Sequence, residues 1–368
     1  MLSTKEQPFY IRLAFNLAII LLIAIFIRTG KLVIVPLYFA VLLSILLLPL
    51  TNFFEKIKIP RTLAALLSVL LALVFIGSIV WFLSDHLTRF LADIPSIKNN
   101  IQEHFATLQA WIEQRFNISS EQQSRFLKNA GNDVGYPSTA YIGQTLLTVT
   151  QTVLLIIIVI IYSFLLLYYR RHIQKVIFAL YNKAHQVQVQ EALQESKSVV
   201  KSYMLGLVIE MLIIATANSA VLLLIGIKYA IFLGVFAAVL NIIPYIGIFT
   251  GMLFTVLVTL GTSASLHQII WIVISMELIH FVDANFLMPK IVGSRVKVNA
   301  LITILGAVIG GSLIGIPGIF LALPTIAMLK IVFDRVDDLK PWGMLLGDET
   351  PPSPIATRIK KLTTRKKN

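Results

Sequence analysis

The segment Gln268–Met288 has the sequence QIIWIVISMELIHFVDANFLM, in which 21 mostly apolar residues enclose Glu277, His280 and Asp283. About 20 consecutive apolar residues are enough for a helix to cross the hydrocarbon core of a bilayer. A charged side chain at the centre of such a helix costs about 2.5–3.5 kcal/mol on insertion scales. The segment therefore predicts a membrane-spanning helix whose ionisable side chains need a compensating partner.

The composition of the whole chain agrees with a membrane protein. Hydrophobic residues make up 57% of the 368 residues and charged residues 13%, which excludes an ordinary cytosolic enzyme. Lys and Arg exceed Asp and Glu by 13, an excess that the positive-inside rule explains without nucleic acid. The absence of cysteine excludes disulfides, thiolate metal sites and a cysteine nucleophile.

Further apolar segments of similar length occur along the chain. Two other stretches, Tyr229–Leu260 and Val298–Phe333, are broken near the middle by Pro and Gly into halves of 15 to 19 residues, which suits re-entrant or broken helices. Together they predict an all-α polytopic integral membrane protein with about eight to ten membrane segments. The six predicted full spans are Tyr10–Ile27, Leu32–Leu50, Thr62–Leu83, Leu146–Tyr169, Met204–Ile227 and Gln268–Met288.

The charges of the connecting segments predict the orientation. Arg170–Lys201 carries six basic and two acidic residues, and the last eleven residues carry six basic groups and no acid. Both should therefore be cytoplasmic. The polar insert at 84–143 has five basic and six acidic residues, and three preceding spans place it outside if the N-terminus is inside. The first apolar segment is followed at once by a second, so we expect it to be retained as a span and not cleaved as a signal peptide.

Two polar segments show the periodicity of amphipathic helices. Apolar residues recur at intervals of three and four from Ile94 to Ile112, and again from Ile173 to Val187. The first helix would lie on the bundle or membrane or form a partner surface, and the second would lie at the interface with its basic residues near anionic headgroups. The predicted regions are an N-terminal three-helix membrane region at 1–83, an extracytoplasmic amphipathic helical insert at 84–143, the fourth span with a cytoplasmic basic amphipathic helix at 144–203, a transport region at 204–333 and a cytoplasmic basic tail at 334–368.

A weak internal repeat is visible in the transport region. Glu, Ala and Asn coincide when 210–218 is set against 277–285, and each segment precedes a broken hairpin. By the orientation above, the two spans run in opposite directions. We therefore expect residues 204–260 and 268–333 to form an inverted repeat, as in many secondary transporters.

Three of the eighteen acids lie within apolar spans, namely Glu210, Glu277 and Asp283. They indicate a proton- or cation-coupled site or a polar lining for a solute; the alternative is a protonated carboxyl that hydrogen-bonds a neighbouring helix. Glu277, His280 and Asp283 are three residues apart and so share one helix face. His280 would relay protons or make an orienting hydrogen bond. The further ligands of a di-metal Glu-x-x-His site are absent, so no metal and no cofactor are predicted.

The hairpin breaks Asn241–Gly247 and Gly310–Gly318 are the second feature with functional meaning. Pro removes a donor and Gly allows close backbone approach, so freed carbonyls and half-helix ends could line a substrate path. The alternative is a kink that serves packing alone. The chain has no phosphate-binding loop and no His-Glu-x-x-His helix, and we expect no enzyme activity.

Four motifs stand out in the transport region: YMLGLVIE at 203–210, NIIPYIG at 241–247, DANFLMPKIVG at 283–293 and GIPGIFLALP at 315–324. Together they resemble the autoinducer-2 exporter family of bacterial membrane proteins. The family pattern commonly has two consecutive amides or an acid–amide pair where this chain has Asp283-Ala284-Asn285. The resemblance implies a secondary transporter of the bacterial inner membrane that works by an elevator-like displacement as a homo-oligomer, with pentamers described in the family. The matching positions in the transport region are Glu210, Asn241, Pro244, Gly247, Glu277, Asp283, Asn285, Pro289, Gly315 and Pro317.

Three functional hypotheses follow. The first is an exporter of a small polar solute such as the quorum-sensing signal autoinducer-2, in which Glu277 and Asp283 couple a proton. The second is a sodium (lithium)/proton antiporter, and the third is a non-transporting membrane scaffold whose insert and tail recruit partners. In the first hypothesis the solute is bound by Asn241, Tyr245, Asn285 and Ser312.

Overall fold

The computed structural model describes residues 8–93, 110, 113–115, 140–182, 186–242, 246–262, 266–291 and 298–347. Every regular element in these ranges is helical, and six of their helices are long and apolar enough to cross a membrane. The protein is therefore an all-α, multi-pass membrane protein, as the sequence predicts. The candidate spanning segments are Lys31–Lys56, Arg61–Ala92, Leu154–Ala179, Gln186–Ile225, His267–Leu287 and Ile316–Arg335.

Five of these segments lie on spans that the sequence predicts, and the sixth differs. Helix α13 (Ile316–Arg335) forms the second half of a predicted broken hairpin, yet its 20 residues are long enough to cross. It continues through Pro324 and past Phe333 to Arg335. The first predicted span lies within helix α1 (Phe9–Thr29), which has 21 residues.

The chain folds into two compact units, each built from separated stretches of sequence. The first unit comprises Met1–Arg28, Gln174–Tyr203 and Gly293–Asn368, and the second comprises Thr29–Ile173 and Met204–Val292. Helices α1, α6 (Ala140–Ala179) and α7 (Gln186–Ile225) contribute residues to both. The five predicted regions and the inverted repeat stay predictions.

The second unit begins with the antiparallel helices α2 (Lys31–Lys56) and α3 (Arg61–Ala92). A buried hydroxyl pair joins them, because Thr51 Oγ1 donates to Ser68 Oγ at 2.9 Å and Ser68 Oγ donates to the carbonyl of Ala64 at 2.7 Å. Helix α6 packs against α2 and α3 through Leu167, which is buried with Leu47, Ala65 and Val69. The unit therefore has a rigid corner where α2, α3 and α6 meet.

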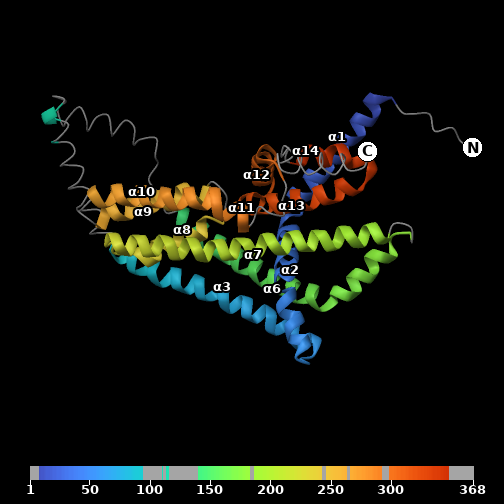
Figure 1. Ribbon diagram of the computed structural model, residues 1–368, viewed down its shortest axis with the longest axis horizontal. Coiled ribbons are helices and arrows are strands. Elements are labelled where there is room, and N and C mark those ends of the chain that lie inside the picture. The colour runs from blue at the N-terminus through green and yellow to red at the C-terminus, as the bar shows by residue number, and fades with distance from the viewer. Residues whose placement is uncertain are drawn as a thin grey trace, which may run out of the picture. The chain divides into compact units, whose positions relative to one another are not determined.

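A helical hairpin of α8 (Ala230–Leu240) and α9 (Ile246–Thr262) follows in the same unit (Figure 1). Eleven residues of α8 rise only about 16 Å, so this helix cannot cross a bilayer core. Its close packing depends on small residues: a Cβ on Gly234 would lie 2.5 Å from the backbone nitrogen of Ser219 in α7, and one on Gly247 would lie 1.8 Å from the Leu240 carbonyl oxygen. The hairpin is therefore held tightly against α7 and closed at its tip.

Helix α10 (Leu266–Val282) runs beside α9 and leads into a π-helical turn, η1 (Asp283–Leu287), and the short helix α11 (Met288–Ile291). The sequence explains the turn. Pro289 has no N–H to donate to the carbonyl of Asn285, which removes one regular helical bond, and the N–H of Met288 bonds the carbonyl of Asp283 five residues back.

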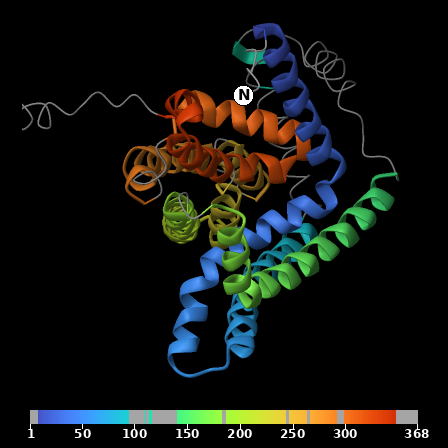
Figure 2. The same ribbon diagram turned by 90° about the vertical axis from the view of Figure 1, so that its right-hand side faces the viewer.

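The first unit contains a second hairpin, α12 (Ala300–Ile314) and α13, which lie side by side in both views (Figures 1 and 2). Gly315 joins them with φ of 75°, a left-handed conformation that favours glycine. A Cβ on Gly318 would lie 1.9 Å from the carbonyl oxygen of Gly310. Asn299 caps α12 by accepting the N–H of Ile302 at 2.8 Å, and its amide donates to the carbonyl of Leu345 at the end of α14 (Lys340–Leu346).

One predicted amphipathic helix is divided in the structure, and another lies almost wholly outside the described residues. The apolar pattern from Ile173 to Val187 is divided in the structure, because α6 ends at Ala179 and α7 begins at Gln186. The predicted helix from Ile94 to Ile112 in the insert lies outside the described residues, apart from Ala110. The role of the insert therefore stays a prediction.

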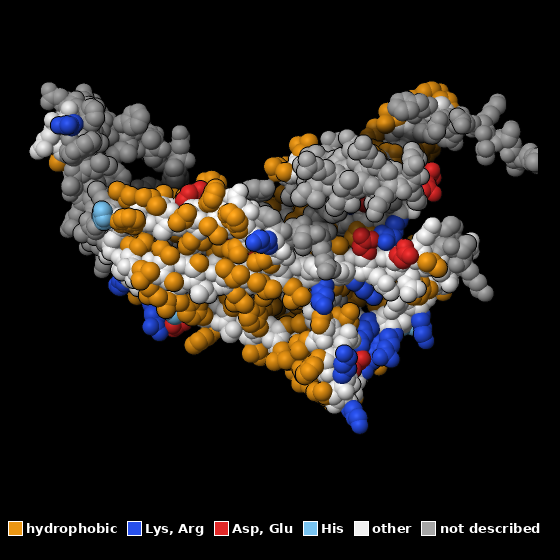
Figure 3. Space-filling view, viewed as in Figure 1, with side chains coloured by type: hydrophobic (Ala, Val, Ile, Leu, Met, Phe, Trp, Pro, Cys, Tyr) orange, Lys and Arg blue, Asp and Glu red, His pale blue; other side chains and the backbone are white. Residues whose placement is uncertain are grey.

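Apolar side chains cover the outer surface of the second unit. Figure 3 shows them over the face formed by α7, α9 and α10. A water-soluble protein does not expose such a continuous apolar face, whereas a bilayer solvates it. Exposed examples on these helices are Ile209, Leu212, Leu253, Leu257, Ile274 and Leu278.

Candidate functional site

Glu210 lies on the buried face of α7. The buried positions of this helix recur at intervals of three and four, so Glu210 occupies a place in the pattern that is otherwise mostly apolar. Only 6% of the Glu210 surface is exposed. The members of the face around it are Tyr203, Leu207, Ile214, Asn218 and Leu222.

The end of α10 supplies two more buried ionisable groups. Ile272, Met276, His280 and Asp283 follow one another at intervals of four and three on the buried face, with His280 8% and Asp283 4% exposed. Asp283 is the first residue of the π-helical turn η1. Such turns are rare and occur frequently at functional sites, because they redirect a side chain without ending the helix.

These helices bring Glu210 and Asp283 together. The two carboxyl groups interact electrostatically. Asn241, the C-terminal cap of the hairpin helix α8, donates from Nδ2 to Asp283 Oδ2 at 3.4 Å. His280 lies one turn before Asp283 and interacts with it electrostatically. Three elements of one compact unit therefore converge on a cluster of Glu210, Asn241, His280 and Asp283, which we call the carboxyl cluster.

Several polar atoms of the carboxyl cluster are buried without a hydrogen-bond partner. They are Oε2 of Glu210, Oδ1 of Asp283 and Nδ1 of His280. Buried polar atoms are almost always paired, because an unpaired one costs about 1–3 kcal/mol. Two adjacent carboxylates cannot both keep a full charge there, so the pair needs a proton or a cation. The cluster can therefore bind and release a proton or a small cation.

Glu277 and Asn285, which the sequence places with Asp283, face elsewhere. Glu277 is exposed, and the Asn285 amide donates to the carbonyl of Phe281 at 2.8 Å within its own helix. Glu277 and Asp283 are six positions apart and so lie about 120° apart around the helix, which is enough to separate Glu277 from the buried face. Glu277 interacts electrostatically with His280 of the carboxyl cluster, and its predicted role with Asp283 stays a prediction.

The remaining predicted residues fall into three groups. Pro244 and Tyr245 lie outside the described residues, and Gly247 forms the tip of the α8–α9 hairpin beside Asn241. Pro289 lies in α11 after the π-helical turn. Gly315 and Pro317 belong to the other compact unit, where they begin α13.

Asn218 is a buried residue that the sequence reading did not select as a site. It lies two turns after Glu210 on the same face of α7, is 1% exposed, and neither polar atom of its amide has a partner. One feature of the sequence could have identified Asn218: it aligns with Asn285 when the two copies of the internal repeat are compared. An uncharged amide costs less free energy in an apolar helix than a charged side chain does. Composition alone therefore does not identify it as a candidate site residue.

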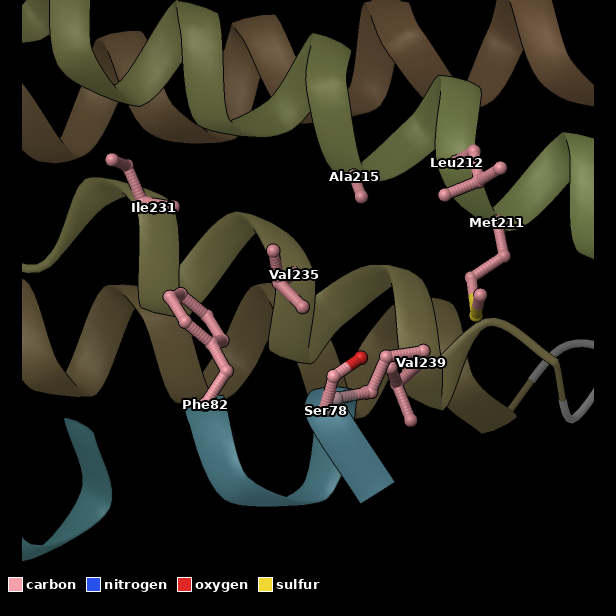
Figure 4. Close-up of a pocket in the computed structure, with 9 residues that line it drawn as sticks. Ser78, Phe82, Met211, Leu212, Ala215, Ile231, Val235 and Val239 are labelled. Atoms are coloured by element: carbon pink, nitrogen blue, oxygen red, sulfur yellow. The ribbon is translucent and has the colours of Figure 1, made fainter. Parts of the chain in front are cut away.

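An apolar cavity of about 310 Å³ lies beside the same helices (Figure 4). Figure 4 shows side chains of α3, α7 and α8 around it, and Ser78 carries its one hydroxyl. That hydroxyl already donates to the carbonyl of Phe75 at 2.7 Å. The cavity therefore offers little to a hydroxyl-rich solute. Its other lining residues are Ile79, Phe82, Met211, Leu212, Ala215, Ile231, Val235 and Val239.

A multi-pass helical protein that buries carboxyl and amide groups within its apolar segments has the architecture of a membrane transporter. Residues 15–338 match the family model described as AI-2E family transporter, and the chain belongs to this family.

Similar proteins from bacteria cover nearly the same length. The chain is 27% identical over 314 residues to a Bacillus subtilis (strain 168) protein named "Putative transport protein YueF", covering 81% of this chain and 82% of that protein. It is 22% identical over 358 residues to "AI-2 transport protein TqsA" of Escherichia coli (strain K12), covering 92% and 96%. The family and these relatives identify the chain as a membrane transport protein.

Proposed function

We propose that this chain is a secondary active transporter that exports a small polar solute, with Glu210 and Asp283 coupling export to a proton or a monovalent cation. The observation that carries the proposal is the burial of Glu210, His280 and Asp283 in one cluster, in which Asn241 donates to Asp283 at 3.4 Å. Intramembrane carboxyls are costly and mark proton and ion pathways in many transporters. No other described part of the chain gathers as many buried ionisable groups.

The coupling chemistry needs only the cluster itself. With one proton on the pair, a carboxyl can donate to its neighbour and the charge is shared. When a monovalent cation enters, the proton leaves, and the carboxylate oxygens and the Asn241 amide oxygen are suitable ligands. One positive charge replaces another, so the net charge of the buried site is unchanged.

The proposed solute is autoinducer-2. The name of the Escherichia coli relative supports this choice, as does the polar character of the cluster. Asn218 and Asn241 each offer amide donors and acceptors, which suit a neutral, hydroxyl-rich molecule. From the family resemblance we further propose a homo-oligomer, a pentamer, that moves solute by an elevator-like displacement in the bacterial inner membrane, with both termini cytoplasmic.

Reconstituted liposomes provide the test. Export of autoinducer-2 should be driven by a proton or sodium gradient, and Glu210→Gln or Asp283→Asn should lower the driven rate by at least about tenfold. Glu277→Gln is the comparison, because it removes an acid of the same span on the exposed face. Equal rates for wild type and Asp283→Asn would contradict the proposal.

A sodium (lithium)/proton antiporter is the second candidate, and the paired carboxyls favour it because they suit exchange of a cation for a proton. Here a sodium gradient alone should move protons across the liposome membrane without any organic solute. The same two variants should abolish that flux. If protons move only when the organic solute is present, the result would support the exporter instead.

The scaffold hypothesis stays a prediction. Deleting residues 93–133 should then remove the cellular function while leaving vesicle transport unchanged.

A further inference from the structure

Two arginines of α6 contact one carboxylate at the end of α2, and a third arginine, Arg61 at the start of α3, lies near Arg170. Arg170 Nη2 donates to Glu55 Oε2 at 2.6 Å, and Arg171 Nη2 approaches the same oxygen at 3.5 Å. The guanidinium of Arg61 lies 5.6 Å from the ring centre of Tyr168. All these residues belong to one compact unit. Figure 3 shows Lys and Arg side chains gathered around the turn that joins α2 and α3.

This arginine cluster contains N–H donors that have no hydrogen-bond acceptor. Nε and Nη2 of Arg61 and Nη1 of Arg170 are buried and lack a hydrogen-bond partner. Buried unpaired guanidinium groups are costly, and three positive charges face a single negative one. The free donors come from two helices, α3 and α6, so their natural complement is one anion with several acceptor oxygens.

One acceptor in the arginine cluster is also unpaired. Glu55 Oε1 is buried without a partner, although Glu55 Oε2 is already bonded to Arg170. A phosphodiester group by itself has no donor for this oxygen and would be repelled by it. A ligand that carries both a phosphate and a hydroxyl group satisfies the arginines and the glutamate together.

The arginine cluster lies at the level of the membrane where such ligands are found. Glu55 and Arg61 flank the turn between two candidate spanning helices. Lys56 and Lys58 lie in or beside the same turn. Helix ends of this kind lie in the headgroup region, and basic pockets between spanning helices bind anionic lipid headgroups.

We propose that Arg61, Arg170 and Glu55 form a binding site for the headgroup of an anionic phospholipid of the phosphatidylglycerol type. The phosphodiester accepts hydrogen bonds from Arg61 and Arg170, and a glycerol hydroxyl donates to Glu55 Oε1. Arg171 is more exposed, with 67% of its side chain accessible, and adds charge at the rim. The site is separate from the carboxyl cluster and does not depend on the proposed transport function.

Native mass spectrometry of the full chain in detergent tests the site, with phosphatidylglycerol, phosphatidylcholine and inorganic phosphate as probes. Wild type should retain phosphatidylglycerol in preference to phosphatidylcholine. Arg61→Gln should weaken this binding by about tenfold. Arg89→Gln is the matched control, because it removes an arginine at the other end of the same helix and should leave binding unchanged.

Two further measurements keep the test decisive. Phosphatidylglycerol should raise the thermal unfolding temperature of wild type and of Arg61→Lys more than that of Arg61→Gln, since lysine keeps the positive charge. Equal lipid binding by wild type and Arg61→Gln would overturn the proposal. Displacement of the lipid by millimolar inorganic phosphate would show a site for soluble anions and would overturn the assignment to lipid.

Discussion

The amide of Asn241 donates a hydrogen bond to the carboxylate of Asp283 across 3.4 Å, although 42 residues separate them in sequence. Asn241 ends the hairpin helix α8, and Asp283 begins the π-helical turn after α10. The bond therefore joins the tip of a hairpin to the point where a spanning helix changes its winding. Protonation of Asp283, or binding of a cation to it, would therefore change its hydrogen bond to the hairpin.

The first prediction concerns this bond. Asn241→Leu keeps the approximate volume but removes the donor to Asp283, leaving a buried carboxylate oxygen without its partner. Driven transport in liposomes should fall by about tenfold, which corresponds to about 1.4 kcal/mol. Asn285→Leu changes an exposed amide that bonds only its own helix, so its effect should be much smaller. Equal losses in both variants would remove Asn241 from the site.

The second prediction is that Glu210 and Asp283 act as one unit. If the pair holds one exchangeable proton, either Glu210→Gln or Asp283→Asn destroys the exchange, and the double variant should lose little more than each single one. Transport rates of the four proteins in one liposome preparation give the comparison. Losses that multiply would indicate two independent roles.

The third prediction concerns the α12–α13 hairpin. A methyl group on Gly318 would overlap the carbonyl oxygen of Gly310, so Gly318→Ala should force the helices apart and destabilise the protein by about 1–3 kcal/mol. Gly77→Ala in α3 is the control, because nothing lies within 4 Å of the added carbon. That change should be neutral or stabilise by about 0.5–1 kcal/mol. Thermal unfolding in detergent measures both.

The fourth prediction is a pH dependence at the end of α3. Asp93 accepts hydrogen bonds from Lys228 and Tyr229, which precede and cap the hairpin helix α8. The bonds from Lys228 and then Tyr229 hold the pKa of Asp93 below its ordinary value of 3.8, and the bond to Asp93 raises the pKa of Lys228.

A lowered carboxyl pKa stabilises the fold above pH 3.8 and loses that effect as the pH falls through the lowered value. A raised lysine pKa stabilises below 10.5 and loses the effect above it. Asp93→Asn should therefore lower the unfolding temperature most between these limits and progressively less in more acidic buffer. Added salt should shrink the difference, because the groups are partly exposed. A difference that is constant from pH 7 to pH 3 would refute the assignment.

Local sequence signals predicted the helices and their membrane character well. Length and apolarity are properties of each segment alone, so α2, α3, α7 and α10 could be located from the sequence. The end of α13 and the division near Ala179 were harder, because a helix boundary depends on tertiary contacts as well as propensity.

The carboxyl cluster could be predicted only in part. The scarcity of acids in apolar segments identified Glu210 and Asp283 individually, since each is costly in lipid. Their pairing could not be read, because 73 positions separate them and periodicity describes only one helix at a time. Glu277 illustrates the same limit. Its spacing from Asp283 suggested that the two side chains share a face, but the Glu277 side chain is exposed in the structure.

The sequence by itself therefore determined that lipid is the solvent, which segments are helices, and which few residues are too polar for their surroundings. Only the tertiary structure decided which of those residues meet. The reason is physical: burial in lipid is a property of a segment, whereas a hydrogen bond or a shared proton requires two side chains from different helices within a few ångströms. Glu210, Asn241 and Asp283 satisfy that condition in the folded protein, and their separation along the chain conceals it.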